Sequence, residues 1–222
     1  MALPTPSLVT PSSAICDGVR WITASARIAV AATVAALTLL TPSPPANAAQ
    51  WKAKVEIRTY PVTGTTGQSI YESIGRNGPK IGKTRAIAHT TFDLKWRRKY
   101  VPVGRSCKLV SAKPFFTIIY TVPKVTGKLP PDTARKWKTF HAGILAHEKV
   151  HGQYARDMLA SLIGNTVGLT VQNDPNCQKI RAEVLTRVKA AYATYRNRSR
   201  AFDRVETAGN GGIRRLVRGF LG

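Results

Sequence analysis

The chain after residue 50 begins with segments in which apolar and polar residues alternate. This pattern covers three segments, at residues 52–60, 86–96 and 115–122. Successive side chains of a β-strand point to opposite faces of the sheet, so a period of two indicates a strand with one buried face. In the first segment the shared face carries Ala53, Val55, Ile57 and Thr59. The sequence therefore predicts a sheet built from this part of the chain.

The spacing of apolar residues changes to three and four from Pro131 onward. This period predicts a helix of about 30 residues, which begins at the N-cap Asp132 and stops at Gly164-Asn165. A second helix is predicted to open at Asp174-Pro175, an N-cap followed by proline. Strands followed by helices are typical of an α+β fold. We therefore predict an N-terminal antiparallel sheet packed on a C-terminal helical hairpin.

The first 48 residues have the features of a secretory signal peptide. Arg20 and Arg27 precede an apolar run at 28–40, and an Ala-x-Ala site follows at Ala46-Asn47-Ala48. The run is short for a transmembrane helix, which needs ~20 residues, and an uncleaved N-terminal anchor is the alternative. Cleavage near Ala48 predicts a secreted or periplasmic protein of the cell envelope.

Basic residues outnumber acidic ones in the part that would be exported. The sequence has 34 Lys and Arg against 11 Asp and Glu, a net charge of +23, and removal of residues 1–48 leaves +22. A hydrophobic fraction of 43% is enough for a core, and a charged fraction of only 20% excludes a disordered polyelectrolyte. The charge favours anionic partners such as an anionic cell-envelope surface. No standard nucleic-acid-binding motif is present, so no specific nucleic-acid partner is predicted.

Two of the three cysteines remain after signal cleavage. Cys16 lies in the signal segment, whereas Cys107 and Cys177 lie in the exported part. An even pair in an exported chain favours a disulfide, here between the third strand region and the start of the second helix. Two buried free thiols are the alternative. Zinc ligation by both cysteines is disfavoured, because neither belongs to a Cys-x-x-Cys pair.

The clearest candidate chemistry lies in the middle of the long predicted helix, at His147-Glu148-Lys149-Val150-His151. Positions i and i+4 lie one turn apart on one face, so both imidazoles can bind the same Zn²⁺. Glu148 is rotated by ~100° from His147 and can take a proton from a water that the metal activates. These are the parts of a metallopeptidase. A surface helix with two solvated histidines is the alternative.

Several short motifs follow one another along the chain. They are Tyr60–Thr65, Ser73-Ile74, Asn77-Gly78-Pro79, Ala88-His89-Thr90, the cysteine pair, and Trp137, Phe140 and Leu145 before the His-Glu-x-x-His segment. Over residues 51–205 this order resembles a family of predicted secreted zinc-dependent bacterial proteases, long filed as a domain of unknown function. The resemblance implies Zn²⁺ as cofactor, a peptide or protein substrate, His147 and His151 as metal ligands, and Glu148 as catalytic base.

One departure from that family concerns the third metal ligand. The family pattern closes with Asp-x-x-Thr-Asp-His-Gly, whereas the chain reads Asp203-Arg204-Val205-Glu206-Thr207-Ala208-Gly209. Ala208 thus stands where the resemblance implies a histidine. Carboxylates also bind zinc, so Asp203 and Glu206 are the predicted replacements.

Other candidates for the third ligand stay open. Asp157 follows His151 by six residues, an offset found in metzincins, but Tyr154 stands where those proteins need a glycine. Glu183 lies beside the inner face of the second helix. The two remaining histidines, His89 and His141, are better explained by structural hydrogen bonds.

Two functions are compatible with these patterns. The first is an exported zinc-dependent metallopeptidase, favoured by the intact His-Glu-x-x-His. The second is a non-catalytic envelope-binding protein on the same fold with a degraded metal site, favoured by Ala208.

The predicted organisation is a signal peptide at 1–48, a zincin-like protease domain at 49–208, and a Gly-rich linker with a basic amphipathic tail at 209–222. For the tail, membrane binding, docking on its own domain and fraying stay open.

Overall fold

The computed structural model describes residues 51–222. The predicted signal peptide, with its cleavage site and Cys16, lies outside the described residues. The strands of the described part are β1 (Lys54–Val62), β2 (Lys80–Ile81), β3 (Thr84–Arg85), β4 (His89–Val103), β5 (Ser106–Val125) and β6 (Thr170–Val171). Its helices are α1 (Gly67–Asn77), α2 (Pro131–Thr166), α3 (Gln178–Thr207) and α4 (Gly212–Leu221).

The main sheet contains both parallel and antiparallel pairs. β4 and β5 form a long antiparallel hairpin that turns at Gly104, and β6 pairs with the start of β5. β1 runs parallel to β5, from Lys54 beside Thr117 to Val62 beside Val125, so the prediction of a wholly antiparallel sheet is wrong. A parallel pair needs a long crossover, which the chain from α1 to β4 supplies. Side-chain alternation carries no information about the direction of a neighbouring strand.

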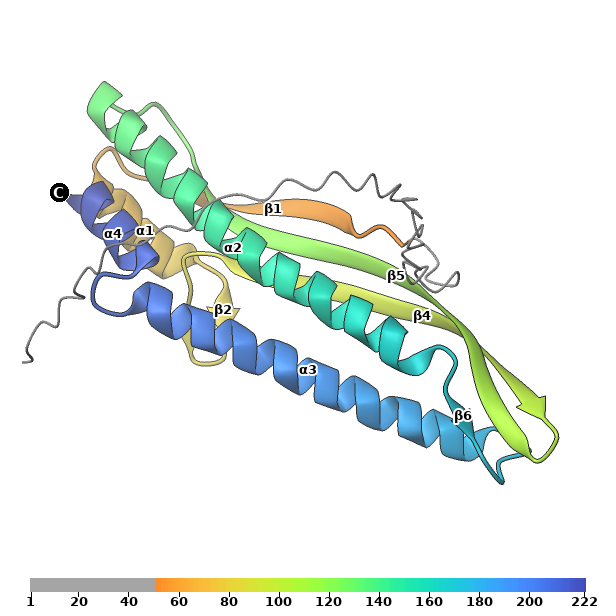
Figure 1. Ribbon diagram of the computed structural model, residues 1–222. Coiled ribbons are helices and arrows are strands. Elements are labelled where there is room, and N and C mark those ends of the chain that lie inside the picture. Colours follow the sequence, from red (N-terminus) through yellow and green to blue (C-terminus); the bar gives the residue numbers. More distant parts are fainter. Residues whose placement is uncertain (1–50) are drawn as a thin grey trace, which may run out of the picture. The chain divides into compact units, whose positions relative to one another are not determined.

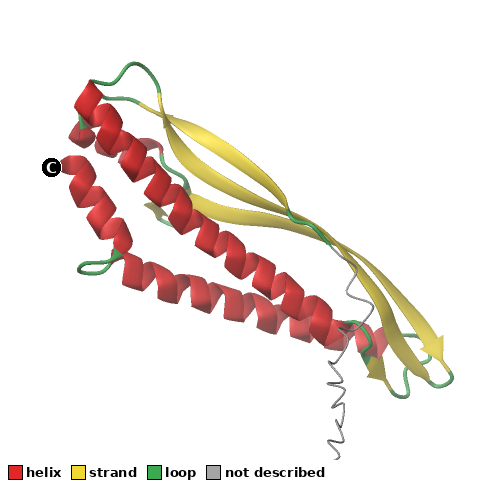
Figure 2. Ribbon diagram, turned by 45° about the horizontal axis from the view of Figure 1, so that its top comes forward, coloured by secondary structure: helices red, strands yellow, loops and turns green. Residues whose placement is uncertain are grey.

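Helices α2 and α3 lie side by side, run in opposite directions and cover one face of the sheet (Figures 1 and 2). The buried side chains of β5 show which face this is: Ala112, Pro114, Phe116, Ile118, Tyr120 and Val122. The predicted α+β class is therefore confirmed. At the edge of the sheet, β1 leaves Val55 46% and Ile57 55% exposed, although the alternation there predicted a buried face.

A glycine sets the distance between α2 and the sheet. A Cβ atom added at Gly152 would lie 2.1 Å from the hydroxyl oxygen of Tyr120, a buried residue of β5. Only glycine therefore allows this approach, one residue after His151. α2 spans 36 residues, more than predicted, and Asp132 lies in its first turn and pairs with Arg135 instead of capping the helix.

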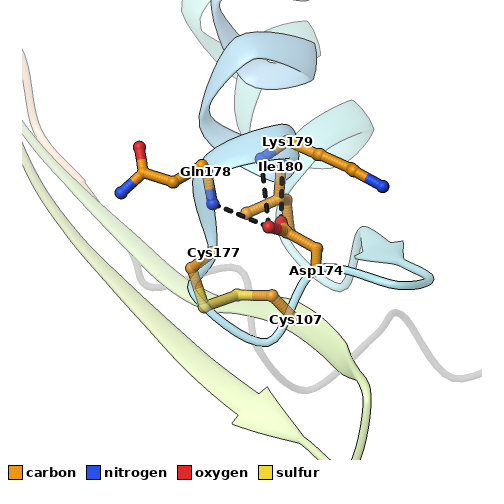
Figure 3. The surroundings of a disulfide bond; sticks show 6 residues. All are labelled: Cys107, Asp174, Cys177, Gln178, Lys179 and Ile180. Carbon is orange, nitrogen blue, oxygen red and sulfur yellow. Dashed lines mark hydrogen bonds between the residues drawn. A yellow bond between two sulfur atoms is a disulfide. The ribbon is translucent and has the colours of Figure 1, made fainter.

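The start of α3 is held by a carboxylate and a disulfide (Figure 3). The helix begins at Gln178, not at the predicted Asp174-Pro175. Asp174 nevertheless caps the start of the helix. Its carboxylate accepts hydrogen bonds from the backbone N–H groups of Gln178, Lys179 and Ile180 at 2.7, 3.1 and 2.9 Å. Burial works against the charged form, yet these bonds lower the pKa of Asp174.

The predicted disulfide is confirmed. Cys107 at the start of β5 is bonded to Cys177 immediately before α3, across a sequence separation of 70 residues (Figure 3). Both cysteines are buried with Leu109, Ile180 and Val184 in a core cluster of their own. The bond therefore joins the strand half of the chain to the helical half.

The C-terminal tail is part of the folded protein. Helix α4 packs against α1, α2 and α3. Its Phe220 is 1% exposed and stacks on Phe140 of α2, with 4.6 Å between the ring centroids. Of the alternatives for the tail, the structure thus shows docking on the chain's own domain. Within residues 51–222, no helix has the length and apolar character needed to cross a membrane.

Candidate metal centre

Two neighbouring helices bring three metal-binding side chains together. His147 and His151 lie one turn apart on α2, and Asp203 lies in the last two turns of α3. Asp203 Oδ1 is 3.2 Å from His147 Nε2 and 2.9 Å from His151 Nε2, and the two Nε2 atoms are 3.1 Å apart. The three atoms therefore form a nearly equilateral triangle.

The donor atoms of this triangle suit a zinc ion. Ligand atoms ~2.0–2.1 Å from a tetrahedral zinc are separated by about 3.3 Å, close to the three distances observed. Two imidazole nitrogens and a carboxylate oxygen are also a usual set of zinc ligands. Within residues 51–222, His147, His151 and Asp203 are the one group of three histidine, cysteine or acidic residues close enough together to hold a metal ion.

Aromatic packing fixes the orientation of both imidazoles. Phe202 stacks on the His147 ring, with 4.7 Å between centroids and planes inclined by 21°. The same ring meets His151 edge-on at 5.5 Å. Because Phe202 directly precedes Asp203, one turn of α3 both packs the rings and supplies the carboxylate.

The second nitrogen of His147 faces another carboxylate. Nδ1 of His147 is buried and has no hydrogen-bond partner among the described residues. The Oε2 atom of Glu206 lies 3.8 Å from it. Histidines that bind metals through one ring nitrogen commonly donate the other N–H to a carboxylate. The structure thus places Asp203 with the two Nε2 atoms and Glu206 on the opposite side of His147.

The charges of the cluster are coupled. Burial of the His151 ring opposes its charged form, but the hydrogen bond and charge of Asp203 outweigh burial and raise the pKa of His151. Burial likewise opposes ionisation of Asp203, yet the hydrogen bonds to His147 and His151 hold its pKa well below the usual range. Asp203 is therefore ionised at neutral pH, as a metal ligand needs to be.

Glu148 lies on the sheet side of α2, where a threonine holds it. Its side chain is buried, and the Thr90 hydroxyl donates to Oε2 at 2.5 Å. The same hydroxyl is 3.0 Å from the backbone carbonyl oxygen of Glu148. Thr90 is itself buried near the start of β4. One side chain of the sheet therefore fixes both the carboxylate and the helix that carries it.

Two further titratable side chains feel the charges of the cluster. Burial lowers the pKa of His89. The charges of Glu148 and Asp203 oppose this shift, and the charge of His151 adds to it. Burial raises the pKa of Tyr195, and Glu148 and Asp203 raise it further. Both groups are thus uncharged at neutral pH, as a neutral imidazole and a protonated phenol.

Comparison with known proteins gives the family. The model of a family described as bacterial protein of unknown function (DUF922) matches residues 57–211, well over half of the chain. The chain belongs to the DUF922 family. The matched range contains His147, Glu148, His151, Asp203 and Glu206, and it ends immediately before α4. The family carries no assigned activity. Neither curated proteins nor solved structures gave a match.

The other predicted ligands of this DUF922 protein lie outside the triangle. Asp157 pairs with Arg198 at 2.8 Å, and Glu183 pairs with Arg187 at the same distance. His141, for which the sequence predicts a structural role and no metal contact, packs against Trp137, with 5.6 Å between ring centroids. These residues therefore have structural partners of their own.

Sequence reasoning missed Thr90 and Phe202 as parts of this candidate site. A signal existed for Thr90, because it is the one hydroxyl residue among the alternating positions Ala88, Phe92 and Leu94 that face the helices. Phe202 had no such signal, since an aromatic residue on a helix is ordinarily part of a core. Its role depends on how α3 is rotated against α2.

Proposed function

We propose that this protein is an exported zinc-dependent metallopeptidase that hydrolyses peptide bonds with Glu148 as general base. The observation that carries the proposal is the triangle of His147 Nε2, His151 Nε2 and Asp203 Oδ1, with sides of 3.1, 3.2 and 2.9 Å. Three protein ligands are the number that a catalytic zinc site uses, because its fourth position is kept for water or substrate.

Asp203 supplies the metal-binding atom that Ala208 lacks. Ala208 is the C-cap of α3 and has no metal-binding atom, whereas Asp203 lies five residues earlier on the same helix. The loss of a histidine at Ala208 was the main argument for a non-catalytic envelope-binding protein with a degraded metal site. Because a carboxylate lies at the cluster, the geometry favours the peptidase over this alternative.

When bound to these residues, Zn²⁺ supplies Lewis acidity, which polarises a substrate carbonyl and makes water more acidic. Glu148 provides the base. Its Oε2 atom accepts a hydrogen bond from the Thr90 hydroxyl, so the carboxylate has a fixed orientation. Its Oε1 has no donor among the described residues and takes the proton of the attacking water, which it then gives to the leaving amine.

Glu206 acts through His147. With its Oε2 atom 3.8 Å from Nδ1, it favours the tautomer that carries the proton on Nδ1 and leaves the lone pair on Nε2. Phe202 holds the same ring by stacking. Both residues are positioning residues, and neither is proposed as a ligand.

Export is supported by the disulfide between Cys107 and Cys177, because such bonds persist in oxidising compartments outside the cytosol. The apolar run at 28–40 and the Ala-x-Ala site support the same location, secreted or periplasmic. The substrate is then a peptide or protein of the cell envelope, and the net charge of +22 that remains after removal of residues 1–48 favours contact with its anionic surface.

The test of catalysis is Glu148→Gln, which keeps the shape of the side chain and removes the base. We expect this variant to retain zinc and to lose peptide cleavage by about 10²- to 10⁴-fold in kcat. Cleavage is measured on a quenched fluorescent peptide library, and zinc by elemental analysis. Glu183→Gln, which changes an acid paired with Arg187 away from the cluster, is the matched control and should cleave normally. Undiminished cleavage by Glu148→Gln would remove it from the mechanism.

A further inference from the structure

A cavity of about 680 Å³ lies between α2 and α4, directly beside the candidate metal centre. Its lining residues come from α2, from the last turns of α3 and from α4, the helix that follows the range matched by the family model. His147 and Glu206 line the end nearest the cluster. A ligand in this cavity therefore contacts the same imidazole that contributes to the triangle.

Most of the cavity wall is apolar. Val150 and Phe202 form the part near His147, and Leu216 and Phe220 of α4 form the opposite part. A glycine lets α4 pack closely on α2 at this wall, because a Cβ at Gly143 would lie 2.5 Å from the Leu216 side chain. A bulky apolar side chain is the group that such a wall would bind, since burial of its surface drives the contact.

The rim of the cavity is basic. Arg135 and Lys136 of α2 and Arg215 of α4 reach it from two sides, and all three are exposed. Arg135 is paired with Asp132, whereas Lys136 and Arg215 form no ion pair within residues 51–222. Glu206, turned towards His147, is the acid on the lining. An anionic group at the rim would thus meet two uncompensated cations.

We propose that this cavity is the side-chain pocket of the peptidase and selects peptides in which a bulky apolar residue lies next to an acidic residue. The proposal rests on the proposed function and adds the class of substrate. The apolar side chain packs between Phe202 and Leu216, and the neighbouring carboxylate pairs with Lys136 and Arg215. The large positive charge of the chain favours the same acidic peptides by long-range attraction.

The test uses the zinc-loaded protein and matched peptides that differ at two central positions, Phe-Asp, Phe-Lys, Ala-Asp and Ala-Lys, each in both orders. We expect kcat/KM for a Phe-Asp pair to exceed that of the other combinations by roughly tenfold or more. Lys136→Glu combined with Arg215→Glu should remove the preference for Asp over Lys. Lys128→Glu combined with Lys138→Glu changes the net charge equally, away from the cavity, and should keep the preference.

Binding separates this proposal from the proposed function. The affinity of Glu148→Gln for the same peptides, measured by fluorescence anisotropy, should follow the same order. If no peptide is cleaved but the affinities keep that order, the proposed function fails and the pocket stands. Equal rates for all peptides, equal affinities, or an unchanged preference after Lys136→Glu with Arg215→Glu would each overturn the pocket.

Discussion

At the scale of single residues, the site depends on side chains that orient the chemically active groups. Thr90 fixes Glu148 by a 2.5 Å hydrogen bond, and Phe202 fixes His147 by stacking. Glu206 faces the remaining nitrogen of the same histidine. A buried carboxylate is costly unless hydrogen bonds satisfy it, so Thr90 is required as soon as Glu148 is placed against the sheet.

Removal of the Thr90 hydroxyl tests this role. Thr90→Val keeps the shape of the side chain but leaves Glu148 Oε2 without its donor. We expect kcat to fall by about tenfold or more, because an unsatisfied buried group costs about 1–3 kcal/mol and the carboxylate loses its orientation. Zinc content should not change, and Thr90→Ser should restore activity. A variant with normal kcat would show that the bond to Glu148 has no catalytic importance.

At the scale of the elements, the close contact between α2 and β5 brings the His-Glu-x-x-His segment to the sheet. Tyr120 packs against Gly152, and Thr90 bonds to Glu148 one helical turn earlier. A glycine in the middle of a helix ordinarily costs about 1 kcal/mol relative to alanine. Its presence in α2 is explained by the 2.1 Å that would separate a Cβ from the tyrosine hydroxyl oxygen.

Gly152→Ala should therefore destabilise the protein despite the better helix propensity of alanine. We expect a loss of about 1–3 kcal/mol in the free energy of unfolding, the usual cost of overpacking a core. Gly164→Ala on the same helix is the control, because a Cβ there meets nothing within 4 Å, and it should be neutral or stabilising. Urea denaturation measures both. Equal stability of the two variants would contradict the close approach.

The elements that depend on local pattern could be predicted from the sequence. The periods of two and three to four residues gave the strands and the helical hairpin, and the cysteine count gave the disulfide. The direction of β1 and the start of α3 could not be read, because each depends on contacts between distant segments. The choice between Asp203 and Glu206 was also open, since residues three apart on a helix share a face.

At the scale of the whole molecule, acidic residues are rare, and three of them lie at the candidate centre. Glu148, Asp203 and Glu206 are three of the chain's 11 acidic residues, against 34 basic ones. The disulfide acts at the other end of α3, because 26 residues separate Cys177 from Asp203, roughly 39 Å of helix. Stability and chemistry are thus carried by opposite ends of this helix.

The disulfide should contribute to stability without affecting the metal centre. In the chain-entropy model, closing a loop of this length, with a sequence separation of 70 residues, stabilises the fold by about 4 kcal/mol. We expect Cys107→Ser combined with Cys177→Ser to lower the free energy of unfolding by this amount, as measured by denaturant titration. Zinc affinity of the folded variant should stay normal. A variant as stable as the oxidised protein would contradict this role of the bond.

The central claim is that His147, His151 and Asp203 form one metal centre, and a zinc titration of the purified protein tests it most directly. We predict one Zn²⁺ per chain and a loss of more than roughly 100-fold in affinity for Asp203→Ala, beyond what loss of an outer-sphere partner costs. Glu206→Gln should lose about 10- to 100-fold, as expected for an outer-sphere partner. Asp157→Ala, which breaks only a pair with Arg198, should bind zinc normally. Substoichiometric zinc, or an Asp203→Ala affinity equal to that of the unchanged protein, would contradict the account.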